Sequence, residues 1–187
     1  MGKIWLSSDW HFCHNKEFLY GPRGFSSIEE ANEEIVRRHN EVVAEDDDVY
    51  VLGDLMLGNN DIGMSYIEKM NGNIHVILGN HDTNTRLEIY KNSPKIKSVQ
   101  YAYQINLRKY TFYLSHYPTY MGNYDLQMSK VWCLHGHTHF KEKFGDIDKN
   151  YNVALDAHNC YPVDLETIVK DIQNKWNEIH KVQVMSK

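Results

Sequence analysis

Short apolar runs alternate with amphipathic segments through the first half of the chain. The runs have strand length and end at polar residues, at 3–7, 49–52 and 74–78. The segments that follow them place apolar residues at helical spacing, at 28–43, 62–70 and 83–91. Ser27–Glu30 has the form of a capping box at the start of the first helix. This alternation predicts parallel β-α-β units.

Strand patterns crowd together in the second half. Residues 99–107 and 110–114 predict a hairpin through Arg108 and Lys109, and two further runs follow at 131–134 and 151–155. Asp164 is placed to cap a final helix whose apolar face runs from Leu165 to Ile179. The sequence therefore predicts an α/β fold with an antiparallel second half, in a single domain over residues 1–187.

Polar residues gather where these predicted strands end. Five clusters do so: Asp9 with His11, Asp54, Asn80 with His81, His116, and His137 with His139. Open α/β sheets bind ligands at the carboxyl ends of their strands, so the clusters are expected to converge. Alternate residues of an extended segment point the same way, which lets each Asp-x-His or His-x-His pair grip one side of a site. Imidazole, carboxylate and amide donors without cysteine suit Mn²⁺, Fe, Zn²⁺ or Ni²⁺.

The ordered motifs carry a family resemblance. Asp9-x-His11, Gly53-Asp54, Gly79-Asn80-His81-Asp82, His116 and Gly136-His137-Thr138-His139 closely resemble the calcineurin-like metallophosphoesterase superfamily, and the first motif resembles its small bacterial and phage subgroup. The resemblance implies a two-sheet β-sandwich flanked by helices (αββα), with the metals at the carboxyl ends of the strands. It implies two divalent ions, most readily Mn²⁺. It assigns Asp9, His11 and His139 to the first ion, Asn80, His116 and His137 to the second, and Asp54 to both.

The same resemblance implies a reaction. A metal-bridging hydroxide attacks phosphorus, His81 protonates the leaving oxygen, and Asp82 holds the His81 imidazole. The chain lacks the capping domain that some members carry, so the site is expected to be open, which favours phosphodiesters slightly over monoesters. The substrate is expected to be a small phosphate ester or a nucleotide.

Two residues of the loop after the first motif are candidate substrate contacts. His14 could reach the phosphate or simply stabilise the loop by a hydrogen bond. Arg23 could bind phosphate, although exposed basic residues more often bind nothing specific. Two other features have plainer interpretations: the acidic run Glu45–Asp48 predicts a solvated turn, and Asp156 predicts a supporting or structural role close to the site.

Composition narrows the partners and the compartment. A formal net charge of −5 and a pI of about 6.1 give no basic footprint for duplex nucleic acid. No apolar run approaches the length of a membrane span, and no signal peptide precedes the first strand. Three scattered cysteines fit a reducing cytoplasm better than a disulfide framework. The oligomeric state stays open.

The sequence leaves three other functions as alternatives to the leading hypothesis. A phosphomonoesterase or protein-phosphatase-like activity would use the same motifs. A protein-binding scaffold, as in the retromer subunit that resembles this superfamily, could dispense with some ligands, whereas every motif position is filled here. A nuclease resembling the double-strand-break repair members is disfavoured by the small size and the acidic balance.

Overall fold

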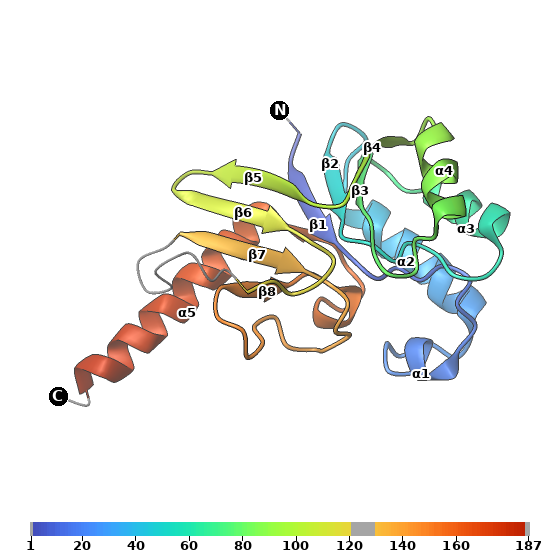
Figure 1. The fold of residues 1–187 in the computed structure, drawn as a ribbon. Helices are drawn as coiled ribbons and strands as arrows, with labels where there is room; N and C mark the ends of the chain where they lie inside the picture. The colour runs from blue at the N-terminus through green and yellow to red at the C-terminus, as the bar shows by residue number, and fades with distance from the viewer. Residues whose placement is uncertain (1, 121–129, 186–187) are drawn as a thin grey trace.

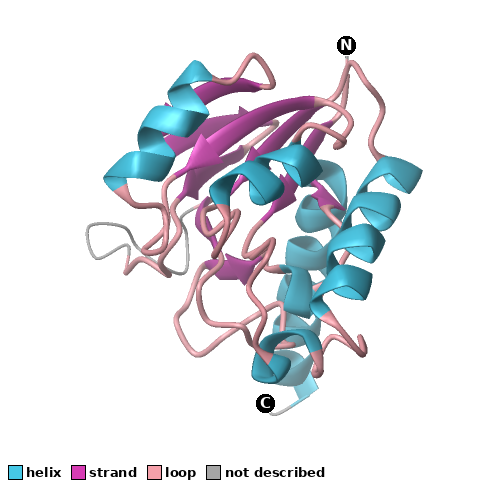
Figure 2. Cartoon of the chain, turned by 90° about the vertical axis from the view of Figure 1, so that its right-hand side faces the viewer, coloured by secondary structure: helices cyan, strands magenta, loops and turns pink. Residues whose placement is uncertain are grey.

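Two β-sheets form the centre of the structure, with helices around them (Figures 1 and 2). The computed structural model describes residues 2–120 and 130–185. The first sheet has the strand order β4-β3-β2-β1-β9, with β1 (Ile4–Ser7), β2 (Asp48–Val51), β3 (Asn73–Ile77), β4 (Ile96–Gln100) and β9 (Val163–Asp164). The second has the order β5-β6-β7-β8, with β5 (Tyr103–Leu107), β6 (Tyr110–Leu114), β7 (Val131–His135) and β8 (Asn150–Asn152).

The helices are α1 (Glu17–Tyr20), α2 (Ile28–Val42), α3 (Asn60–Ile67), α4 (Asn84–Asn92) and α5 (Leu165–Met185), with a 3₁₀ turn at Leu155–Ala157. This arrangement confirms the predicted α/β fold with two sheets flanked by helices. Within the described residues, no helix is both long and apolar enough to cross a lipid bilayer.

Strands β1 to β3 contact apolar cores on both faces of the first sheet, which explains why their sequences are mostly apolar. Trp5 and Val51 belong to a core shared with α2 and α3, whereas their neighbours Leu6 and Leu52 belong to a second core. That second core also takes in the second sheet and the apolar face of α5. Strands β1 to β4 pair in parallel, as the strand–helix alternation predicts.

The helix starts follow their sequence signals. The Ser27 hydroxyl accepts a hydrogen bond from Glu30 N at 3.1 Å, and the Glu30 carboxylate accepts one from Ser26 N at 2.7 Å. Asp164 Oδ1 accepts from Thr167 N at 3.0 Å at the start of α5. Both predicted caps are therefore confirmed, and they satisfy amide groups that would otherwise lack a partner.

The second half differs from the prediction in two ways. The single strand expected at 99–107 divides at Tyr101, which is 77% exposed: β4 completes the first sheet and β5 opens the second. The β5–β6 hairpin through Arg108 is antiparallel as predicted, but β6, β7 and β8 pair in parallel. The prediction of an antiparallel second half is wrong for β6 to β8, although β9 does pair antiparallel with β1. Strand direction depends on long connections that carry no local signal.

The acidic run is only partly the solvated turn that was predicted. Glu45 and Asp46 are exposed, but Asp47 is buried. Its carboxylate accepts hydrogen bonds from Lys3 N at 2.6 Å, Trp5 Nε1 at 2.8 Å and Ala44 N at 3.0 Å. Asp47 therefore fastens the start of β1 to the turn before β2.

Acid should destabilise the fold through His39, which is buried in α2. Its Nε2 bonds the Asn71 carbonyl at 3.0 Å, and burial lowers its pKa to about 4. Since the unfolded chain binds the proton more tightly, stability is full above the ordinary pKa and is lost as the pH falls from about 6.5 towards 4. We expect this to cost about 2 kcal/mol by pH 5.

The measurement is chemical denaturation of wild type and His39→Gln with chelator present, at about pH 7.5 and about pH 5. Glutamine keeps an N–H donor for the Asn71 carbonyl but does not titrate. The difference in unfolding free energy between the two proteins should shrink by about 2 kcal/mol at the lower pH. An equal difference at both pH values contradicts the assignment.

Candidate metal centre

The predicted ligands all lie just beyond the carboxyl ends of strands. Asp9 and His11 follow β1, Asp54 follows β2, Asn80 follows β3, His116 follows β6, and His137 and His139 follow β7. Two hydrogen bonds join the loops of the two sheets: His137 N donates to Asp9 Oδ2 at 2.9 Å, and His116 Nδ1 bonds Leu52 O at 2.7 Å. Strand ends from both sheets therefore converge on one place.

The backbone at this place is unusual. Five of the predicted ligands have positive φ angles: Asp9 (58°), His11 (52°), Asp54 (56°), His137 (68°) and His139 (52°). Non-glycine residues rarely adopt this left-handed region, and such strain clusters at functional sites. The expectation that Asp9-x-His11 and His137-x-His139 are extended segments is therefore wrong. Left-handed backbone conformations, not strand alternation, determine the direction in which these side chains point.

One oxygen of each buried carboxylate is fixed by a backbone amide. His137 N donates to Asp9 Oδ2 at 2.9 Å, and His81 N donates to Asp54 Oδ1 at 2.8 Å. Gly79 packs so closely that a Cβ there would collide with the Asp54 carboxylate. These contacts orient Asp9 and Asp54 and leave Asp9 Oδ1 and Asp54 Oδ2 facing the histidines.

Two histidines are oriented in the same way. His116 Nδ1 bonds the Leu52 carbonyl at 2.7 Å, and His139 Nδ1 bonds Asp156 Oδ2 at 3.0 Å. Because both partners are acceptors, each Nδ1 carries the proton, and in the neutral rings Nε2 keeps a free lone pair. This pattern of Nδ1 held and Nε2 free is the one that metal-ligating histidines show.

The remaining donor atoms face one another at metal-ligand spacing. His11 Nε2 lies 3.8 Å from Asp9 Oδ1 and 3.7 Å from Asp54 Oδ2. His139 Nε2 lies 3.7 Å from Asp9 Oδ1, and His116 Nε2 lies 3.6 Å from Asp54 Oδ2. Two ligands about 2.1 Å from a shared ion are separated by roughly 3–4 Å, so these distances fit.

Several of these atoms have no hydrogen-bond partner among the described residues. They are buried and include Asp9 Oδ1 and both ring nitrogens of His11. Unsatisfied buried polar atoms are costly, so such a cluster needs a ligand to compensate them. Donor atoms within 4.8 Å of one another form two overlapping groups: Asp9, His11 and His139, and Asp9, Asp54 and His116.

The other two predicted ligands adjoin the second group. Asn80 Oδ1 lies 2.8 Å from His116 Nε2, and the His137 ring centroid lies 5.0 Å from that of His116. With His116 Nε2 unprotonated, two lone-pair atoms meet at this short distance, an arrangement that a shared cation stabilises. The residues present therefore fit a metal centre.

The pKa values of the two buried carboxylates, Asp9 and Asp54, are shifted in opposite directions. Burial opposes ionisation of Asp9, but the nearby imidazoles of His11, His139 and His116 outweigh it and lower its pKa to about 2. Burial raises the pKa of Asp54, although His116 acts in the opposite direction. For His139, the Asp156 hydrogen bond outweighs burial and raises the pKa. A cation at the centre would offset the cost of keeping both carboxylates charged.

Comparison with known proteins agrees with this geometry. A sequence model described as calcineurin-like phosphoesterase matches residues 2–185. The chain belongs to this family. It is accordingly a metal-dependent hydrolase that acts on phosphate esters.

Two relatives extend over nearly the whole chain. The uncharacterised protein MJ1445 of Methanocaldococcus jannaschii is 36% identical over 182 residues, which cover 92% of this chain and 93% of that protein. The crystal structure of AQ665, a protein of unknown function from Aquifex aeolicus, superposes with a TM-score of 0.72 at 19% identity. That match covers 91% of this chain and 99% of AQ665 and supports the fold.

In this phosphoesterase, Asp82 does not hold the His81 ring as predicted. Within the described part of the chain, its carboxylate accepts hydrogen bonds from Asp54 N at 2.9 Å, Gly79 N at 2.8 Å and the Tyr90 hydroxyl at 2.8 Å. Asp82 thus ties the loop after β3 to the loop after β2. The physical reason is that backbone amides at two strand ends need an acceptor, and the half-buried Asp82 carboxylate supplies it.

Arg23 does not contact substrate as predicted, because its side chain is only 3% exposed. Its Nε and Nη2 bond both oxygens of Asp156 at 3.0 and 2.8 Å, and Nη2 also bonds the Asp9 carbonyl at 2.8 Å. Asp156 in turn bonds His139, as its predicted supporting role requires. Against burial, His139 and Arg23 together lower the pKa of Asp156 well below its usual range. Arg23 and Asp156 therefore hold two of the proposed ligands, Asp9 and His139, in place.

Replacing Asp156 with asparagine should weaken metal binding by about 10- to 100-fold, the usual cost of losing an outer partner of a ligating histidine. The reason is that His139 loses the charged acceptor that fixes its ring. Calorimetric titration with Mn²⁺ measures the affinity. Asp171→Asn is the matched control, since Asp171 also bonds side chains, Tyr151 and Lys143, but lies outside the site. Equal affinities in the two variants would refute this role of Asp156.

Five of the seven predicted ligands line a pocket of about 560 Å³ together with His81: His11, Asp54, Asn80, His137 and His139. His14 lines it as well, with its ring centroid 5.2 Å from that of His11 and 6.4 Å from that of His81. Burial and the neighbouring His11 and His81 lower the pKa of His14 to about 4. The structure therefore leaves His14, unlike Arg23, in a position to meet substrate.

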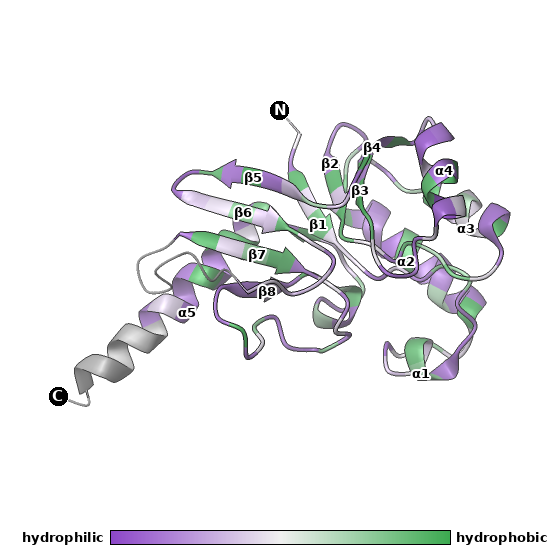
Figure 3. Cartoon of the chain, in the orientation of Figure 1, coloured by the Kyte–Doolittle hydropathy of each residue, from purple (hydrophilic) through white to green (hydrophobic). Residues whose placement is uncertain are grey.

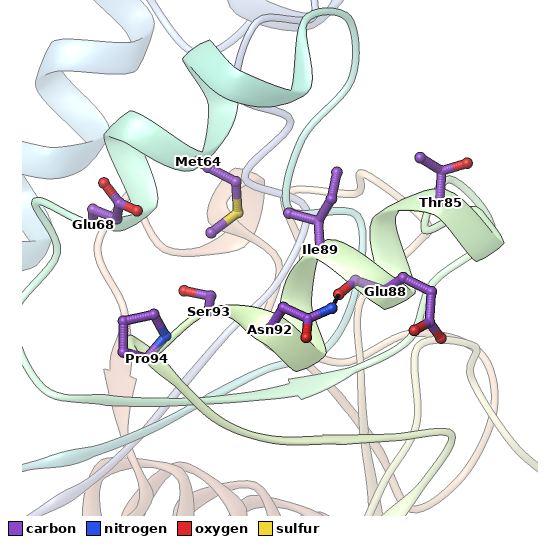
Figure 4. Close-up of a pocket in the computed structure, with 8 residues that line it drawn as sticks. All are labelled: Met64, Glu68, Thr85, Glu88, Ile89, Asn92, Ser93 and Pro94. Carbon is purple, nitrogen blue, oxygen red and sulfur yellow. Dashed lines mark hydrogen bonds between the residues drawn. The ribbon is translucent and has the colours of Figure 1, made fainter.

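A second pocket of similar size, about 540 Å³, lies between α3 and α4 (Figure 4). Its lining includes Met64 and Ile89, with Glu68 and Glu88 at the sides, and Asn92 Nδ2 bonds the Glu88 carbonyl there at 2.7 Å. It shares no residue with the first pocket and contains no histidine. Of these two pockets, the first is the one whose described lining residues supply the donor atoms that the family chemistry needs.

Proposed function

We propose that this phosphoesterase works with two divalent ions held by Asp9, His11, Asp54, Asn80, His116, His137 and His139. The observation that supports it most strongly is the convergence of lone-pair atoms, several without a hydrogen-bond partner, at spacings of 3.6–3.8 Å. The donors are imidazole, carboxylate and amide, which suit Mn²⁺ first, and Fe, Zn²⁺ or Ni²⁺ as alternatives. When bound, the ions supply Lewis-acid activation of water and offset charge on the phosphoryl oxygens.

His81 is the proposed general acid. Its side chain is 42% exposed, lines the pocket, and has Nε2 3.9 Å from Asp54 Oδ2. Its backbone is fixed at both ends, since His81 N donates to Asp54 Oδ1 and His81 O accepts from the Arg86 guanidinium. A half-exposed ring on a fixed backbone can protonate a leaving oxygen and then exchange its proton with solvent.

Phosphodiesters are the proposed substrates. Among its described lining residues the pocket has no lysine or arginine, and Arg23 is already paired with Asp156. A monoester dianion carries one charge more than a diester, so it has more need of such cations. The chain's three free cysteines, Cys13, Cys133 and Cys160, accord with the proposed cytoplasmic location.

A metal-by-substrate matrix tests this function. Metal-stripped protein is reloaded with Mn²⁺, Zn²⁺, Fe²⁺ or Ni²⁺ and assayed with bis(p-nitrophenyl) phosphate and p-nitrophenyl phosphate. We expect Mn²⁺ to restore most activity and the diester to have the higher kcat/KM. A clear monoester preference would overturn the diester proposal. Metal-replete protein that is inert on every simple ester would favour the protein-binding scaffold instead.

A further inference from the structure

One wall of the active-site pocket is apolar. It consists of Phe18 and Leu19 from α1, Pro22 from the turn after it, and Leu57 from the loop after β2. The remaining lining residues are histidines, acids and an amide. Figure 3 shows hydrophobic residues on α1, which lies at the edge of the molecule. The pocket lining thus combines a polar set and an apolar set of side chains.

The His14 ring contacts both Phe18 of the apolar wall and the proposed ligand His11. The rings of Phe18 and His14 meet at 90°, with centroids 6.0 Å apart, and His14 in turn lies 5.2 Å from His11. Phe18 is nevertheless 73% exposed. An aromatic ring left in water beside a catalytic pocket is available to pack against a bound molecule.

This wall is held in place. Leu19 is 6% exposed and anchors α1, and Gly21 N bonds the Glu17 carbonyl at 2.8 Å. At the far end of the segment, Arg23 bonds the Asp9 carbonyl and Asp156. The contact that removes Arg23 from the substrate therefore fixes the wall against the metal centre. A backbone fixed in this way lowers the ordering cost of binding.

We propose that Phe18, with Leu19, Pro22 and Leu57, forms a subsite for a flat aromatic group on the organic arm of the phosphate ester. The inference rests on the proposed function, because the phosphoryl group must lie at the histidines for the arm to reach this wall. Aromatic pairing at Phe18 is the selective contact, since His14 already presents a perpendicular ring to it. The substrate class is then an aryl- or base-bearing phosphate ester.

Non-hydrolysable ligands test the subsite without catalysis. Calorimetry on Mn²⁺-loaded protein compares benzylphosphonate, cyclohexylmethylphosphonate and methylphosphonate. We expect benzylphosphonate to bind about 10-fold more tightly than methylphosphonate, and more tightly than the cyclohexyl ligand. In Phe18→Ala the benzyl advantage should fall to about 2-fold or less. Tyr101→Ala is the matched control, since Tyr101 is 77% exposed and does not line this pocket.

A second readout uses turnover of benzyl and methyl p-nitrophenyl phosphate, which share a leaving group. Phe18→Ala should lower kcat/KM for the benzyl ester about 5-fold more, or further, than for the methyl ester. Equal benzyl and methyl affinities in wild type, or a benzyl advantage that survives in Phe18→Ala, overturns the subsite. A cyclohexyl ligand that binds as well as benzyl overturns its aromatic character. Benzyl-selective binding without hydrolysis of any ester would instead leave the subsite standing and sink the proposed function.

Discussion

Asp54→Asn is expected to lower kcat/KM for ester hydrolysis by about 10³-fold or more and to reduce the metal content of the protein. Asp54 Oδ2 lies close to one proposed ligand of each ion, 3.7 Å from His11 Nε2 and 3.6 Å from His116 Nε2. A carboxylate can give both ions a negatively charged oxygen there. An amide offers a single neutral oxygen, and in Asp54 the Oδ1 position already accepts from His81 N.

Replacing Asp54 with asparagine tests the role of its charge separately from its role in the fold. Asp54 has a φ of 56°, a conformation that asparagine adopts more readily than most residues. The substitution keeps an oxygen acceptor for His81 N. It also removes a buried charge whose pKa burial raises, close to the Asp9 carboxylate. In chelator, the variant should therefore be at least as stable as wild type, although it is inactive.

Three measurements decide the outcome: kcat/KM with Mn²⁺, metal per chain after dialysis, and thermal unfolding with chelator. The expected pattern is low activity, fewer bound ions and unimpaired metal-free stability. A variant that retains wild-type metal content and activity contradicts the bridging role of Asp54. A variant that is unstable without metal would show instead that the carboxylate supports the fold itself.

The sequence predicts the start of the fold well because the relevant signals are local. The first three strands are apolar runs buried on both faces, and Ser27 and Asp164 cap their helices through contacts only three residues away. Each strand run also stops at the polar residues that the structure brings together. Periodicity and caps are short-range properties of the chain, so they can be read before the fold is known.

Long-range pairing explains most of what the sequence does not predict. Arg23 and Asp156 are 133 residues apart, and nothing near Arg23 distinguishes a buried guanidinium from an exposed one. The chain leaves the first sheet after β4 and enters the second at β5, near Tyr101. This change of sheet lies inside one continuous strand-like pattern, so the sequence gives no local signal for it. Asp82 stands at the motif position from which it was predicted to hold His81, but its carboxylate bonds backbone amides. A motif does not show which group a side chain contacts.

The apolar wall has a local signal in the sequence. Phe18, Leu19 and Pro22 follow the first motif within a dozen residues, in a stretch predicted to be a polar, aromatic loop, whereas the structure has the helix α1 there. Apolar residues in a loop beside proposed ligands need a partner, because loops seldom form a core of their own. Only the structure places them on the pocket and not in the interior.

His81→Ala should lower kcat by about 10²- to 10⁴-fold for esters with alkoxide leaving groups while metal content stays at the wild-type level. The effect should depend on the leaving group. An alkoxide must be protonated as it departs, whereas p-nitrophenolate can leave as an anion. The loss with a p-nitrophenyl ester should therefore be much smaller than the loss with an alkyl ester of the same phosphate.

This dependence separates an acid from a ligand, which distance alone does not do. His81 Nε2 lies 3.9 Å from Asp54 Oδ2, close to the 3.7 Å at which His11 Nε2 lies from the same oxygen. A ligand's loss would remove metal and slow every substrate alike. His14→Ala is the matched comparison, because His14 lines the same pocket and should raise KM without discriminating between leaving groups. Metal loss in His81→Ala, or equal losses with both esters, would make His81 a ligand or a charge stabiliser, and the proton would then have to come from solvent or from another pocket histidine.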